Sequence, residues 1–134
     1  MIWRRRTLLS AFVLLTPNDC VMRGIEPISL CEVLSHRQEY LNRDIVIHGV
    51  VVFMQHGGFV RALRPCERRT DSDVSLEGLT VPAYNAAGGG KGFGVVATVG
   101  GRLVMSDRYI PHSRPGPHLA FSVRDVRWEK PVDR

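Results

Sequence analysis

The sequence predicts a mainly β protein, a small closed or partly open β-barrel with one short N-terminal α-helix. Three observations favour this class. Glycine (13) and proline (8) are frequent among the 134 residues. Four or five segments rich in β-branched residues are separated by turn residues. The apolar phase of the last segment slips by one residue, as a β-bulge produces. Strands of this kind form a coiled sheet that closes on itself and hides its edges.

The length and the N-terminus together predict the domain organisation. A chain of 134 residues corresponds to one domain. Residues 1–19 hold a run of arginines followed by an apolar stretch, which is the layout of an export signal. We expect residues 20–28 to be a connector and residues 29–130 to be the single folded domain. An amphipathic or buried N-terminal helix is the alternative for the first segment.

The apolar run Leu8–Leu15 is too short to span a bilayer, which takes about 20 residues. We therefore expect the signal-like segment to contact a membrane only transiently. Cys20 follows Asp19, and the residues before it do not match a lipobox, so lipid anchoring through Cys20 is not expected. The predicted location is outside the cytoplasm, in the periplasm or the cell envelope.

The first element of the domain is a short helix from Ser29 to about Arg37. Ser29 and Glu32 match the S-x-x-E capping box, in which the serine caps the helix start. Apolar residues follow at helical spacing. Residues 38–43 then form a turn that leads into the first strand.

The remaining segments change to strand periodicity. Residues 44–55 are apolar on both faces, which predicts a strand covered on both sides. After the turn at 56–58, residues 59–64 pair back as a hairpin, and residues 74–81 form a third strand. Residues 82–92, rich in glycine, are expected to be a flexible loop.

The last two β segments each carry an irregularity. Residues 93–105 contain Gly100-Gly101, which is either a hairpin turn or a bend within one coiled strand. Residues 119–128 form the final strand, and the phase slip places a bulge near Arg124-Asp125.

The order of these features resembles that of exported bacterial OB-fold-like proteins of unassigned activity. The matching features are a leucine–cysteine pair at the start of a short helix, a tyrosine before a turn, a valine-rich strand that holds a glycine, a later cysteine and two further strands. The residues that carry them are Leu30-Cys31, Leu34, Tyr40, Asn42-Arg43-Asp44, Ile45-Val46-Ile47, Gly49, Cys66, the segment 96–103 and Val123 to Val126. The resemblance spans roughly residues 29–128. It implies an OB-like barrel and exported location, and it implies no reaction.

Cys31 and Cys66 are the two cysteines of the folded part. In an exported protein such a pair predicts a disulfide. Two unpaired buried thiols, which behave as small hydrophobic groups, are the alternative.

The motifs for metal, cofactor and catalytic sites are not matched. Cys31 and His36 lack the paired spacing of zinc ligands, and His48 reads as a packed, hydrogen-bonded strand residue. Residues 88–92 lack the serine or threonine of a phosphate-binding loop. We therefore predict no metal, no cofactor, no catalytic residues and no enzymatic activity.

The predicted function is that of an exported, non-catalytic binding or accessory module. Its possible ligand face consists of Arg61, Arg64, Arg124 and Arg127 with the loops 65–73 and 110–118, because OB barrels bind on one sheet face and its flanking loops. The expected partner is an unidentified protein or small ligand, and the expected state is a monomer. The alternative is a cytoplasmic OB protein that binds single-stranded nucleic acid. The net charge of +5 is weak support for it, since Arg4, Arg5 and Arg6 supply three of the charges.

Overall fold

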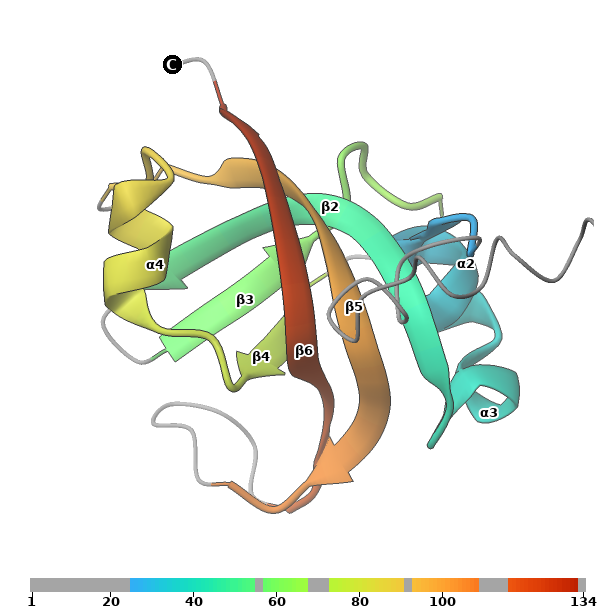
Figure 1. Ribbon diagram of the computed structural model, residues 1–134. Coiled ribbons are helices and arrows are strands. Elements are labelled where there is room, and N and C mark those ends of the chain that lie inside the picture. The colour runs from blue at the N-terminus through green and yellow to red at the C-terminus, as the bar shows by residue number, and fades with distance from the viewer. Residues whose placement is uncertain (1–24, 55–56, 68–72, 91–92, 109–115, 133–134) are drawn as a thin grey trace, which may run out of the picture.

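The computed structural model describes residues 25–54, 57–67, 73–90, 93–108 and 116–132 (Figure 1). The signal-like segment 1–19, Cys20 and most of the connector lie outside these residues. The described part is mainly β, as predicted, and holds six strands and three short helices in the order β1, α2, α3, β2, β3, β4, α4, β5, β6.

The strands form one sheet in the order β1-β2-β3-β4-β6-β5, and β2 also pairs with β5. The strands are β1 (Ile28–Ser29), β2 (Asp44–Met54), β3 (Gly57–Arg61), β4 (Asp73–Glu77), β5 (Val95–Ser106) and β6 (His118–Pro131). The second pairing of β2 closes five of them into a ring of hydrogen-bonded pairs. The β1–β2 and β4–β6 pairs are parallel and the others are antiparallel.

Strand β2 confirms the prediction of a strand covered on both faces. Ile45, Ile47 and Val51 point to one side of the strand, Val46 and Val52 to the other, and all five are buried. β-Branched side chains fit such a strand because they pack well on a pleated surface.

Strands β5 and β6 are long and irregular, and their irregularities let them curve around the ring. Gly100 pairs with Asp125 while Gly101 pairs with Val123, so Arg124 is the extra residue of a bulge at the predicted place. A second shift leaves Glu129 as an extra residue, which the sequence did not predict. Gly100-Gly101 lies within one continuous strand, so the hairpin alternative is wrong. Bulges increase bend and twist, as ring closure requires.

Gly101 shows why a glycine stands in the middle of β5. A Cβ atom added at this position would lie 2.0 Å from the backbone oxygen of Ser122. The close approach of β6 to β5 therefore requires a residue without a side chain.

Two helices replace the predicted single helix and turn after Ser29. The Ser29 hydroxyl caps α2 (Leu30–Ser35) by accepting the Glu32 N–H at 3.2 Å, as the capping motif predicted. The chain leaves helical dihedrals at His36, and α3 (Arg37–Tyr40) follows. Asn42 then adopts a positive φ of 64°, which asparagine tolerates, and its N–H donates to the Leu103 carbonyl at 2.7 Å.

The segment after β4 contradicts the prediction of a strand to residue 81 and a flexible loop thereafter. The strand ends at Glu77, and Gly78 turns the chain with φ of 90°. Helix α4 (Val81–Ala86) follows, because the Thr80 hydroxyl accepts the Ala83 N–H at 3.3 Å and Pro82 lies in the first turn, where proline is tolerated. Tyr84 anchors this helix in the core.

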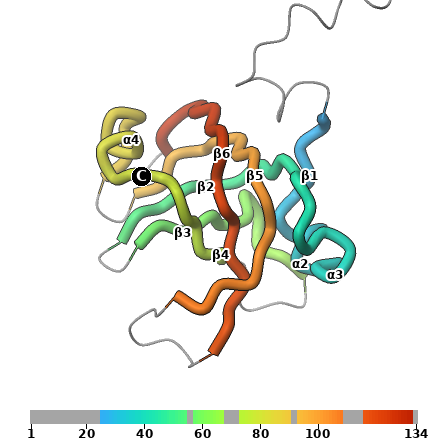
Figure 2. The backbone as a smooth tube through the Cα atoms, turned by 60° about the horizontal axis from the view of Figure 1, so that its bottom comes forward, coloured from blue at the N-terminus to red at the C-terminus, as the bar shows by residue number. Residues whose placement is uncertain are grey.

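The two helical regions lie at opposite ends of the sheet (Figures 1 and 2). Leu30, Val33 and Leu34 of α2 enter the core from one end, and Tyr84 of α4 enters it from the other. Between these ends, buried side chains of the described residues fill the interior of the ring.

Candidate functional site

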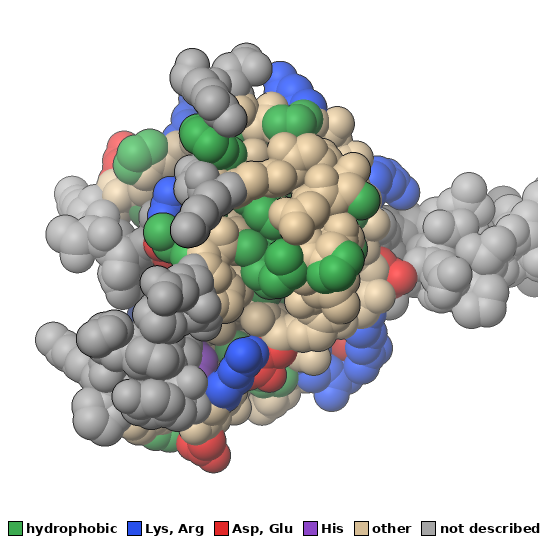
Figure 3. All heavy atoms as spheres, turned by 90° about the vertical axis from the view of Figure 1, so that its left-hand side faces the viewer, with side chains coloured by type: hydrophobic (Ala, Val, Ile, Leu, Met, Phe, Trp, Pro, Cys, Tyr) green, Lys and Arg blue, Asp and Glu red, His purple; other side chains and the backbone are tan. Residues whose placement is uncertain are grey.

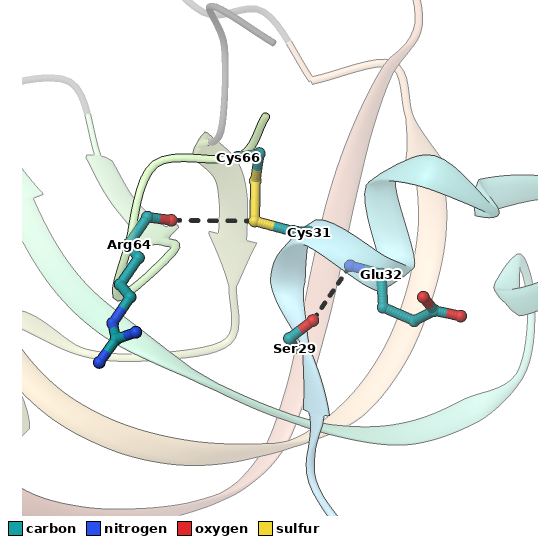
Figure 4. The surroundings of a disulfide bond; sticks show 5 residues. All are labelled: Ser29, Cys31, Glu32, Arg64 and Cys66. Carbon is teal, nitrogen blue, oxygen red and sulfur yellow. Dashed lines mark hydrogen bonds between the residues drawn. A yellow bond between two sulfur atoms is a disulfide. The ribbon is translucent and has the colours of Figure 1, made fainter. Parts of the chain in front are cut away.

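A disulfide joins Cys31 of α2 to Cys66, which follows β3 (Figure 4). The two Cα atoms lie 5.4 Å apart, within the range that a disulfide requires. The structure therefore contains the predicted Cys31–Cys66 bond, and the alternative of two free thiols does not describe it. The bond ties the segment that enters the domain to the segment that leaves the hairpin.

A groove lies beside this disulfide, where β1 and β3 share one edge of β2. Strand β1 pairs with Ile47 and His48, and β3 pairs with residues 50–54, while β5 occupies the opposite edge. Gly49 stands between the two neighbours, and a Cβ atom there would lie 2.7 Å from the Arg61 carbonyl oxygen. Past Arg61 the chain leaves the sheet, and the groove opens between β1 and residues 62–64.

The groove has a volume of about 560 Å³ and an apolar lining with few polar groups. Its lining residues are Pro27, Ser29, Leu30, Cys31, His48, Ala62, Leu63 and Arg64. Leu63 is 47% exposed. A mostly apolar cleft with a small number of polar groups is the common form of a small-ligand site.

A second hollow of about 500 Å³ adjoins the first on the other side of the disulfide. It shares Ser29, Cys31 and Arg64 with the groove, and its other lining residues are Glu32, Ser35, His36, Pro65, Cys66 and Glu67. Arg64 thus lies between an apolar hollow and an acidic one. Its carbonyl oxygen lies 3.8 Å from Cys31 Sγ, and its side chain extends away from the sulfur atoms (Figure 4).

The predicted ligand-face arginines lie on β3, on β6 and on the segment after β3, and within the described residues only Arg61 and Arg124 form ion pairs. Arg61 at the end of β3 donates to the Asp73 carboxylate on β4, with Nε 3.0 Å from Oδ1. This hydrogen bond and the charge of Asp73 raise the pKa of Arg61. Arg124 on β6 pairs with Asp44 at 3.4 Å, and Arg127 lies opposite Thr98 of β5.

Arg64 differs from these arginines because it lines both hollows. Within the described part of the chain, no carboxylate forms an ion pair with its guanidinium. Of the two loops predicted to flank the ligand face, 65–73 and 110–118, residues 68–72 and 110–115 lie outside the described residues.

His48 is hydrogen-bonded, as predicted for a strand histidine, and its partner is Glu129 of the second bulge. His48 Nε2 lies 2.6 Å from Glu129 Oε2, and the Thr98 hydroxyl donates to the same oxygen at 3.2 Å. Glu129 was not predicted as a partner of His48, because only the register shift in β6 brings the two residues together. This polar contact links β2, β5 and β6 at the rim of the groove.

Ser29 and His48 are register partners, so a serine, a histidine and Glu129 follow one another across the sheet. A serine nucleophile requires a hydrogen bond to its base. The Ser29 hydroxyl is instead the acceptor of the Glu32 N–H, and no bond between Ser29 and His48 is present in the described residues. In this arrangement Ser29 caps α2, and His48 and Glu129 form a contact between β2 and β6.

Three aromatic residues of the strands contribute to the core, whereas Phe59 of β3 is half-buried and lies outside the core cluster. Phe121 is fully buried, and Phe53 and Trp128 pack against the core with ring centroids 5.1 and 6.5 Å from that of Tyr84. Stacking platforms for single-stranded nucleic acid need exposed aromatic faces. These three side chains face the interior instead.

The surface at the α4 end is apolar at its centre and charged toward its margin (Figure 3). Met54 at the end of β2 and Val81 of α4 are 55% and 49% exposed. No described residue adds an unpaired charge at its centre, so this surface offers less selectivity than the groove beside the disulfide.

No described helix has the length and apolarity needed to cross a membrane. No group of three or more histidine, cysteine or acidic side chains in the described ranges is arranged to hold a metal ion. No protein-family model, curated protein or solved structure matches the chain.

Proposed function

We propose that this chain is an exported, non-catalytic binding module with an OB-like barrel, and that its ligand occupies the groove around Arg64. An OB-fold is a five-stranded, partly open barrel. The ring β2-β3-β4-β6-β5 has five strands, and its parallel β4–β6 pair and the helix between β4 and β5 are compatible with that fold.

The disulfide supports the exported location. Disulfides form and persist in oxidising compartments and are rare in the cytosol. The Cys31–Cys66 bond occurs in a chain whose first 19 residues have the layout of an export signal. The two features are independent of each other and favour the same compartment.

One observation carries the binding proposal: Arg64 lines both hollows and has no carboxylate partner in the described structure. Arg61 and Arg124 each have such a partner, and Arg127, which has none among the described residues, lines neither hollow. An arginine without a partner retains its full capacity to bind an anion. The disulfide connects the two walls of the groove, so its shape is held before a ligand arrives.

The compartment is tested by expressing the full chain, separating the cell fractions and alkylating the thiols under denaturing, non-reducing conditions. We expect a processed N-terminus by mass spectrometry in the envelope fraction, with Cys31 and Cys66 protected from alkylation until reduction. An unprocessed cytoplasmic protein with both thiols free contradicts the exported location and favours the cytoplasmic alternative.

The absence of catalysis is tested with an activated ester such as p-nitrophenyl acetate. We expect the rate to equal that of an unrelated protein at the same concentration. Hydrolysis that is lost in both Ser29→Ala and His48→Gln contradicts the non-catalytic proposal and assigns the Ser29–His48 row to a reaction.

A further inference from the structure

We propose that the groove binds a small monocarboxylic acid with an apolar chain, with Arg64 contacting the carboxylate and Leu63 contacting the chain. This inference rests on the proposed function, because it assigns a ligand class to the groove named there. It commits to a small molecule, and a peptide, a membrane or a nucleic acid would contradict it.

The arginine in the groove determines the charge of the ligand. Arg61, Arg102 and Arg124 each pair with an aspartate of a neighbouring strand, so their charges are already compensated. Arg64 is the arginine of the groove, and no described carboxylate pairs with it. A guanidinium presents two parallel N–H donors that match the two oxygens of a carboxylate. The groove therefore selects an anion at the Arg64 position.

The acidic residues near Arg64 favour a carboxylate over a phosphate as the ligand group. The hollow on the other side of Arg64 contains Glu32 and Glu67, and also His36, whose Nδ1 lies 3.4 Å from Oε1 of Glu32. A phosphate monoester carries between one and two negative charges near neutral pH, about −1.5 to −2, and it is repelled more strongly by these glutamates than a monoanion is. A single guanidinium beside two carboxylates is consequently better matched to one negative charge than to two.

The apolar residues beside Arg64 determine the rest of the ligand. Leu30, Ala62, Leu63 and Pro27 line the groove next to Arg64. Leu63 lies on a segment outside the sheet and is 47% exposed, so an apolar chain that covers it removes hydrophobic surface from water. The ligand thus needs an apolar part directly attached to its carboxylate.

The volume of the groove limits the size of the ligand. The groove measures about 560 Å³, which lies within the roughly 300–1,000 Å³ of small-molecule sites. Its wall at residues 62–64 is followed closely by Cys66, whose bond to Cys31 fixes it against α2. A short, preformed hollow of this size fits a molecule with a chain of several carbons rather than an extended polymer.

The test is a titration of the oxidised full chain, observed by two-dimensional NMR of the backbone amides. The probes are octanoate, octanol and octyl phosphate, which share the chain and differ in charge. We expect octanoate to shift the signals of groove residues with a saturable profile, and to bind at least 10-fold more tightly than either other probe.

Matched variants locate the charge that matters. Arg64→Gln is expected to weaken octanoate binding by at least 10-fold, and Leu63→Ala by several-fold. Arg127→Gln removes the same charge from a predicted ligand-face residue outside the groove, and it is expected to change binding by less than twofold. Thermal unfolding of each variant shows that the fold is retained.

Each contrary result has a distinct meaning. Equal binding of octanol and octanoate, tighter binding of octyl phosphate, or an equal loss in Arg127→Gln overturns the carboxylate assignment. If only octanol or octyl phosphate shifts the groove signals, the ligand class is wrong while the groove stands as the binding surface. If no probe shifts them, the ligand class fails together with the groove assignment, whereas the compartment test is unaffected.

Discussion

The two ends of the strand ring are closed by different means. At the α4 end, the Tyr84 side chain fills the interior, contacts the rings of Phe53 and Trp128, and donates its hydroxyl to the carbonyls of Gly90 and Phe93. At the α2 end, smaller aliphatic side chains enter the core, and a disulfide joins the helix to the segment after β3.

This difference explains why the groove lies at one end. The buried Tyr84 ring fills the space at the α4 end, and the glycine-rich segment 88–90 packs closely against it. At the α2 end, the covalent bond holds two segments together that are not paired in the sheet, which leaves an open hollow between them. The α4 end is therefore closed by a buried side chain, and the α2 end holds the groove that we propose as the binding site.

The largest effect is expected from Tyr84→Ala, which empties the α4 end. Removing a fully buried aromatic ring lowers the free energy of unfolding by about 3–5 kcal/mol. Tyr84→Phe keeps the ring and removes only the shared hydroxyl donor, so we expect a smaller loss of about 1–3 kcal/mol. Urea unfolding followed by circular dichroism measures both. Equal losses for the two variants would show that the hydrogen bonds, and not the ring, close this end.

The second effect comes from the α2 end, where Cys31→Ala/Cys66→Ala removes the disulfide. The bond spans a sequence separation of 35 residues, and on the chain-entropy account its loss destabilises the fold by about 3–4 kcal/mol. We also expect the amide signals of the groove to broaden, while those of α4 remain sharp. The control is addition of dithiothreitol, which should destabilise the original chain and leave the double variant unchanged. Equal broadening at both ends would remove the distinction between them.

The third prediction compares two neighbouring glycines at the α4 end. A Cβ atom at Gly89 would lie 2.4 Å from Cζ of Tyr84, whereas one at Gly90 would have its nearest contact at 3.5 Å, with Phe93. We expect Gly89→Ala to lower the free energy of unfolding by about 1–3 kcal/mol through overpacking, and Gly90→Ala to have a much smaller effect. The same urea titration measures both. Similar free-energy losses for the two variants would mean that α4 moves freely to accommodate the methyl group, and that Tyr84 is not tightly packed.

The parts of the fold that were predictable from the sequence are those with local signals. Strand β2 follows from its β-branched run, the α2 cap from Ser29 and Glu32, and the bulge at Arg124 from a slip in apolar phase. Each signal lies within the element that it describes. Helix α4 was missed because Thr80 and Pro82, which start a helix, follow a strand pattern and precede three glycines that favour a loop.

The candidate site was less predictable because its parts meet only through long-range pairing. Arg61 and Arg124 looked equivalent to Arg64 in the sequence, yet their aspartate partners lie 12 and 80 residues away along the chain. The groove itself depends on the parallel pairing of the two-residue strand β1 with β2, which has no periodic signal. The cysteine pair was the sequence feature that linked the two segments on either side of the groove.

The smallest effect concerns Asp44, which lies just after α3 and contributes charge to the α2 end. Its hydrogen bond with Arg102, together with the charges of Arg102 and Arg124, holds the pKa of this carboxyl below its ordinary value of 3.8. A carboxyl with a lowered pKa stabilises the folded state above its unfolded pKa, and this contribution disappears as the pH falls through the folded pKa.

Asp44→Asn should therefore shift the urea midpoint slightly downward at pH 7. The difference in urea midpoint between this variant and the original chain should disappear as the pH falls below 3.8. Because Asp44 is exposed, 1 M salt should also narrow the gap. Tyr84→Phe is the contrasting variant, since its loss at the apolar α4 end should persist at both low pH and high salt. A gap for Asp44→Asn that survives at pH 2 would show that the side chain acts through packing, and that charge does not distinguish the two ends.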